Sequence, residues 1–98
     1  MPKFVIERSI PSIGAASAAE MQAISQKSCS VLKDLGPAVQ WVQSYVTPNK
    51  IYCVYQAESE ELVREHARRG GFPADAVEQV MRMIDPATAE PFPVAQGT

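Results

Sequence analysis

The stretch VQWVQSYVTPNKIYCVY, residues 39–55, decides how this chain folds. It contains two runs rich in Val, Ile, Tyr and Trp, residue types that suit a pleated surface. Between them stands Thr47-Pro48-Asn49-Lys50, and Pro and Asn are residues typical of turns. The pattern predicts a hairpin whose strands cover Val39–Val46 and Ile51–Tyr55.

A symmetric hairpin loop would place Val46 opposite Ile51 and sort the strand side chains into two faces, since directly paired residues share a face. One face is apolar with two small members, and we expect it to lie against helices: Val42, Ser44, Val46, Ile51, Cys53 and Tyr55. The other face is aromatic and rich in amides: Trp41, Gln43, Tyr45, Tyr52, Val54 and Gln56.

The aromatic face predicts a protein contact, because Tyr and Trp with polar tips are enriched at interfaces. We therefore expect a homodimer formed through the sheet face that carries Trp41, Gln43, Tyr45 and Tyr52. The alternative is a half-exposed sheet face with scattered aromatic residues.

A helix is expected on each side of the hairpin. The segment Ser17–Leu35 opens with the capping box Ser17-Ala-Ala-Glu20 and stops before a Gly-Pro pair. The segment Glu60–Gly71 has acidic residues in its first turn and arginines in its last, which complements the helix dipole. On its apolar face His66 is expected to point at the sheet or its edge.

Strand-like runs at both ends complete the pattern, at Lys3–Arg8 and at Val77–Ile84. The resulting order, β-α-β-β-α-β, is that of the ferredoxin-like fold. We expect an α+β domain over residues 1–85, with a four-stranded antiparallel sheet and two helices on one face. A Pro-rich, mobile tail is expected over residues 86–98.

The composition argues against several classes of partner. The net charge is −2 and the densest basic point is Arg68-Arg69, so a nucleic-acid surface is disfavoured. No apolar stretch approaches the ~20 residues of a membrane span, and no signal-peptide pattern opens the chain. We expect a cytoplasmic protein that contacts neither nucleic acid nor membrane and keeps its two cysteines reduced.

The single histidine, His66, limits the chemistry that the chain offers, and no GxSxG, P-loop or HExxH motif is present. Imidazole, thiolate and carboxylate are the usual ligands of late first-row metals. His66 with Cys53 makes a partial metal site, and Tyr55 and Glu7 are weaker candidate ligands. By strand parity, Glu7 falls on the expected dimer face. The alternative for His66 is a packed, hydrogen-bonded core residue.

Four stretches together resemble a bacterial family of small proteins, long classed as a domain of unknown function: MPKFVIER, QWVQSYVTPNKIYCVYQA, REHARRGGFPA and IDPATAE. One member of that family is described as nickel-binding. The resemblance covers about residues 1–90 and implies a dimeric ferredoxin-like fold. Some distant relatives have a second histidine one turn after the first, where this chain has Gly70.

The leading hypothesis is a small dimeric protein that binds a transition metal, nickel, without catalysing a reaction. Its candidate ligands are His66, Cys53, Tyr55 and Glu7. A second hypothesis is a small dimeric α/β-barrel-type enzyme, a monooxygenase or isomerase, with His66 as acid or base and Tyr55 orienting an organic ligand. A third is a structural or regulatory dimer that binds no ligand.

Overall fold

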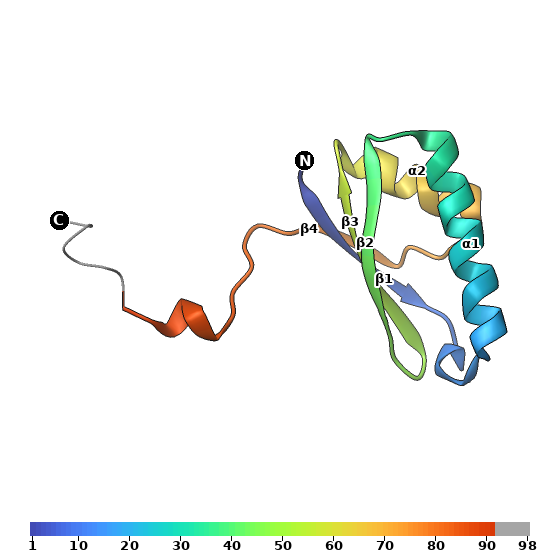
Figure 1. Ribbon diagram of the computed structural model, residues 1–98, viewed down its shortest axis with the longest axis horizontal. Helices are drawn as coiled ribbons and strands as arrows, with labels where there is room; N and C mark the ends of the chain where they lie inside the picture. Colours follow the sequence, from blue (N-terminus) through green and yellow to red (C-terminus); the bar gives the residue numbers. More distant parts are fainter. Residues whose placement is uncertain (92–98) are drawn as a thin grey trace.

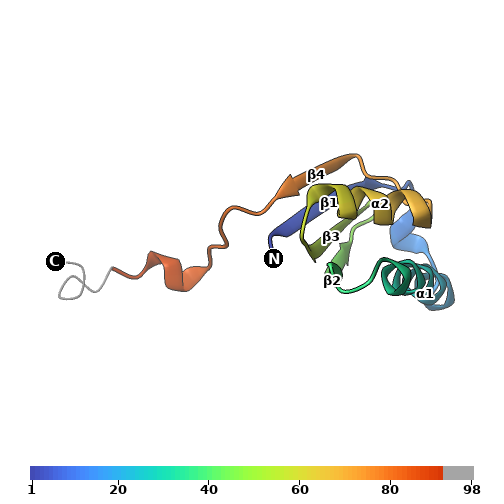
Figure 2. The same cartoon turned by 90° about the horizontal axis from the view of Figure 1, so that it is seen from above.

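The computed structural model describes residues 1–91 and contains one four-stranded antiparallel sheet in the order β2-β3-β1-β4. Both long helices lie on the same face of this sheet (Figures 1 and 2). The predicted ferredoxin-like α+β fold is confirmed. Its strands and helices are β1 (Lys3–Ser9), α1 (Ala18–Leu35), β2 (Val39–Val46), β3 (Lys50–Ala57), α2 (Glu60–Gly70) and β4 (Ala76–Gln79).

The core lies between the sheet and the two helices. In β1, Phe4, Ile6 and Arg8 are buried and alternate with the half-buried Val5 and Glu7, as a period of two requires. The strand β3 buries Ile51, Cys53, Tyr55 and Ala57 on the same side. The helix α2 adds Val63, which is fully buried.

The helix α1 begins at the predicted capping box and ends before the predicted Gly-Pro pair, and α2 covers the predicted segment Glu60–Gly71 except for its last residue. At the start of α1, Ser17 Oγ accepts a hydrogen bond from the Glu20 amide at 3.1 Å, and the Ser17 amide donates to Glu20 Oε1 at 3.0 Å. The helix α2 follows the cap Ser59. Its C-cap is Gly71, whose φ of 70° is left-handed and therefore favours glycine.

The hairpin register is confirmed at its loop end and differs at its far end. Val46 pairs with Ile51, as predicted, but the register shifts between Trp41 and Gln43. Trp41 therefore pairs with Tyr55, a helix-facing residue, and its placement on the expected dimer face is wrong. A β-bulge, in which one extra residue is inserted into one strand, causes the shift.

The last strand is shorter than the predicted Val77–Ile84. Its pairing with β1 ends where Phe4 meets Gln79, and Val80 makes one further hydrogen bond to Lys3. Because β1 begins at Lys3, the chain beyond Val80 has no strand to pair with in its own sheet. The apolar side chains that follow are largely exposed.

The chain then extends away from the sheet and forms a short 3-10 helix over Pro86–Ala89 (Figure 1). The mobility predicted for residues 86–98 stays a prediction, and residues 92–98 of that segment lie outside the described chain. Within residues 1–91, no helix combines the length and apolar character needed to cross a bilayer.

The capping box of α1 gives a direct test of this local structure. Replacing Ser17 with Ala should lower the free energy of unfolding by about 1 kcal/mol, because the Glu20 amide loses its acceptor. Urea denaturation followed by circular dichroism measures the change. The matched control is Ser30→Ala, an exposed position inside the same helix, which should change stability by less than about 0.5 kcal/mol. Equal losses in the two variants would contradict a role for the cap.

Candidate functional site

His66 is a buried residue on the sheet-facing side of α2, and its exposed fraction is 0%. The centroid of its imidazole ring lies 5.0 Å from that of Tyr55 in β3 and 5.6 Å from that of Phe72. The predicted orientation toward the sheet is confirmed.

Helix α1 supplies the polar partner of this histidine. Ser28 is buried, and its Oγ shares a hydrogen bond of 2.9 Å with His66 Nε2. Within residues 1–91 the other ring nitrogen, Nδ1, is buried and has no hydrogen-bond partner. The contact between Ser28 and His66 therefore joins the two helices through one polar bond inside an apolar core.

Arg8 is a functional candidate that the sequence reasoning missed. It is 3% exposed, its Nε lies 3.4 Å from Cys53 Sγ, and its Nη1 donates to the Pro73 carbonyl. The guanidinium also lies 6.0 Å from the ring centroid of Tyr55 and 5.4 Å from that of Phe72. The signal was present in β1, because a charged residue continues the alternation of Phe4 and Ile6 onto the core side.

Burial and the Arg8 charge set the ionisation of this cluster. Burial, together with the positive charge of Arg8, lowers the pKa of His66 to about 4, so the imidazole is neutral at pH 7. Burial also raises the pKa of Tyr55, which keeps its phenol protonated. At neutral pH the charged Arg8 thus lies beside a neutral imidazole and a protonated phenol.

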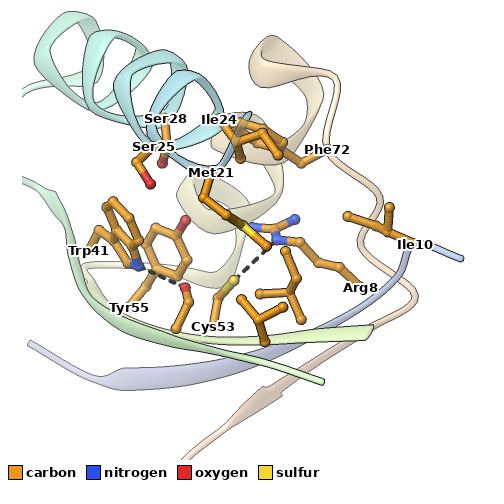
Figure 3. Close-up of a pocket in the computed structure, with 13 residues that line it drawn as sticks. Arg8, Ile10, Met21, Ile24, Ser25, Ser28, Trp41, Cys53, Tyr55 and Phe72 are labelled. Carbon is orange, nitrogen blue, oxygen red and sulfur yellow. Dashed lines mark hydrogen bonds between the residues drawn. The ribbon is translucent and has the colours of Figure 1, made fainter. Parts of the chain in front are cut away.

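A cavity of about 80 Å³ lies between α1 and the sheet, beside this polar group. Figure 3 shows Met21 and Ile24 of α1 facing Trp41, Tyr55 and Cys53 of the hairpin across it. Arg8, Ser28 and Tyr55 line the cavity, whereas His66 does not and lies behind the lining residues Ser28, Tyr55 and Phe72.

The bulge described above brings Trp41 into this wall. Its indole Nε1 donates a hydrogen bond of 2.9 Å to Ser44 Oγ, which holds the ring in one orientation (Figure 3). Trp41 and Ser44 both line the cavity. The regular alternation of a strand gives no sign of this placement, because it assigns Trp41 to the opposite face.

Glu7 lies on the other face of the sheet from His66, Cys53 and Tyr55. It alternates with the buried Ile6 and Arg8 and pairs in register with Tyr52. Its Oε2 lies 3.5 Å from Lys50 Nζ, and its side chain is 35% exposed. The sheet thus separates Glu7 from the other three candidate ligands.

The inner residues do not fit a nickel ion within one chain. In residues 1–91, no three His, Cys, Asp or Glu side chains gather closely enough to hold a metal. The Arg8 guanidinium occupies the space beside Cys53 and Tyr55, and its charge opposes a dication there. The nickel ligand set of His66, Cys53, Tyr55 and Glu7 stays a prediction, with its members divided between two faces of the sheet.

The depressed pKa of His66 predicts a pH-dependent stability. The unfolded chain takes up the imidazole proton near pH 6.5 and the folded chain only near pH 4. The stabilisation is therefore complete above pH 6.5 and is lost as the pH falls toward 4. Between pH 7 and pH 4.5, wild type should lose roughly 2–3 kcal/mol more free energy of unfolding than His66→Gln. Urea denaturation at several pH values measures this, and parallel pH profiles for the two proteins would contradict it.

Comparison with known proteins identifies the family of this chain. The family model described as "Nickel responsive protein SCO4226-like" matches residues 4–80. Among solved structures, the chain is similar to SCO4226 from Streptomyces coelicolor A3(2), with a TM-score of 0.70 and 25% sequence identity. That match covers 84% of this chain and 99% of the other.

A second solved structure, the complex of A. aeolicus tRNASec with M. kandleri SerRS, is 11% identical with a TM-score of 0.36. It covers 94% of this chain and 23% of the other, and the likeness is too weak to bear on this protein. No curated protein matches the chain. The family match spans most of the chain, and the similar solved structure, SCO4226, bears the name of the same family. The chain therefore belongs to the SCO4226-like family of nickel responsive proteins.

Proposed function

We propose that this chain acts in a nickel response as a small cytoplasmic homodimer that binds the metal without catalysing a reaction. The nickel ion is held between two subunits on the outer face of the sheet, and Glu7 supplies a carboxylate. The observation that carries this proposal is that Glu7 lies on the outer face of the sheet, whereas the other three candidate ligands lie on the inner face. Glu7 is partly exposed and forms an ion pair with the partly exposed Lys50, which nickel would displace, whereas the inner candidates are buried beside Arg8.

The outer face supports an association of two copies. Glu7 pairs with Tyr52, which pairs with Tyr45, so these three residues form a row across β1, β3 and β2. Gln43 hydrogen-bonds to the Tyr45 hydroxyl, and Tyr45 is 57% exposed. In a two-fold dimer the same patch meets itself, so each interface would contain two copies of Glu7.

The buried state of His66 supports a non-catalytic role. A general acid or base must reach the proton that it transfers and have a pKa near the working pH. His66 is bonded to Ser28, lies outside the cavity wall and has a pKa of about 4. The second hypothesis, an organic ligand beneath α1, draws its support from the cavity itself rather than from this histidine.

Nickel titration by calorimetry on tag-free protein tests the proposal. We expect one nickel ion per two chains, because two subunits would share the site. Glu7→Gln should weaken binding about tenfold or more, since the neutral amide removes a charged ligand from each subunit. Glu61→Gln is the matched control, because Glu61 is exposed on α2 and away from the sheet.

Two further results separate this proposal from the inner site. His66→Gln should leave the nickel affinity within about twofold of wild type, because the imidazole is not a ligand. One nickel ion per chain, with binding lost in His66→Gln and kept in Glu7→Gln, would contradict the outer-face assignment. Circular dichroism at pH 7 establishes that each variant is folded.

A further inference from the structure

The guanidinium of Arg8 is a buried positive charge for which residues 1–91 supply no counterion. Within residues 1–91, no Asp or Glu forms an ion pair with it, and its Nη2 is buried without a hydrogen-bond partner. Its hydrogen-bond partners are Cys53 Sγ and the Pro73 carbonyl, and the rings of Tyr55 and Phe72 lie within cation–π distance of it. Burying a charge in this way is costly unless an opposite charge compensates it.

The cavity beneath α1 is where such a compensating group would lie. Arg8 lines it, and of the lining residues in the described chain Arg8 is the one with a permanent charge. None of the lining residues in the part of the chain that the structure describes is an Asp or a Glu. A second donor stands nearby, because Tyr55 also lines the cavity and its protonated phenol can donate a hydrogen bond.

The remaining walls suit a flat apolar group. Met21 and Ile24 of α1 face the cavity from one side, and the indole of Trp41 forms part of the other. Aromatic rings stack well on an indole whose orientation is fixed, as the bond to Ser44 fixes this one. Figure 3 shows Arg8 reaching the same space from the side opposite Trp41.

The size of the cavity limits the ligand. Its volume of about 80 Å³ is several times the ~10–15 Å³ that one water molecule needs. The rim includes Val46, which is 45% exposed, so part of a ligand can extend toward solvent. An aromatic carboxylate therefore fits with part of the molecule enclosed and the rest at the rim beside Val46.

We propose that this cavity binds a small aromatic carboxylate, whose carboxylate lies against the Arg8 guanidinium and whose ring packs between Trp41 and the apolar side of α1. The carboxylate supplies the counterion that the buried guanidinium lacks. This inference goes beyond the proposed nickel function and does not rest on it, because the two sites lie on opposite faces of the sheet.

The test uses three probes of similar size and different charge on metal-free wild-type protein: benzoate, benzamide and benzylamine. Binding is followed by the fluorescence of Trp41, the single tryptophan of the chain, and by amide chemical shifts in NMR spectra. Benzoate should bind about tenfold or more tightly than benzamide, because a charge-assisted bond replaces a neutral one. Benzylamine should not bind, since its charge repels that of Arg8.

Variants then assign the preference to Arg8. Arg8→Met should abolish the advantage of benzoate over benzamide, while the control Arg64→Met, an exposed position on α2, should keep it. Equal affinities for benzoate and benzamide in wild type would overturn the proposal. So would the absence of any Trp41 or amide-shift response up to about 10 mM benzoate. If Arg8→Met does not fold, the three probes on wild type still decide the question.

Discussion

The register between the two central strands, β1 and β3, is the constraint on which the rest of this structure depends. It places Ile6 opposite Cys53 and Phe4 opposite Tyr55, all beneath the helices. Because side chains alternate with a period of two, a shift of one residue would move Glu7 under the helices and Arg8 into water. The positions of the buried cation and of the outer carboxylate both follow from this one pairing.

The interior that results is unusual for so small a domain, because it holds a charge and a neutral imidazole among apolar side chains. Arg8 and His66 each retain one polar atom without a protein partner in the described chain. The charge of Arg8 helps to keep His66 neutral, and it disfavours any cation in the same space. A buried positive charge of this kind favours an anion over a metal ion in the interior. The protein family, by contrast, is described as nickel responsive.

The two faces of the sheet thus carry opposite chemistry. The outer face presents Glu7 beside Tyr52, which is the basis for the proposed intersubunit metal site. The inner face presents Arg8 to a cavity walled by Met21 and Trp41, which is the basis for the proposed carboxylate site. A chain with both sites would respond to a metal and to an organic anion independently. The two sites would nevertheless be adjacent along the chain, since Glu7 and Arg8 are consecutive residues of β1.

The sequence by itself determined the order of the elements, the capping box of α1 and the hairpin register at Val46 and Ile51. These depend on local signals, such as the capping box at Ser17 and the turn residues between the strands, whose physics acts over a few residues. The direction in which His66 points also followed from local helical periodicity. Strand parity would equally have revealed Arg8 on the core side.

Only the tertiary structure decided the composition of the site. The bulge that turns Trp41 inward depends on how β2 packs and pairs with β3, and the end of β4 depends on where β1 begins. The bond between Ser28 and His66 joins residues 38 positions apart in sequence, and the contact between Arg8 and Cys53 joins residues 45 positions apart. Such contacts arise from the packing of distant elements, which no pattern within a single element encodes.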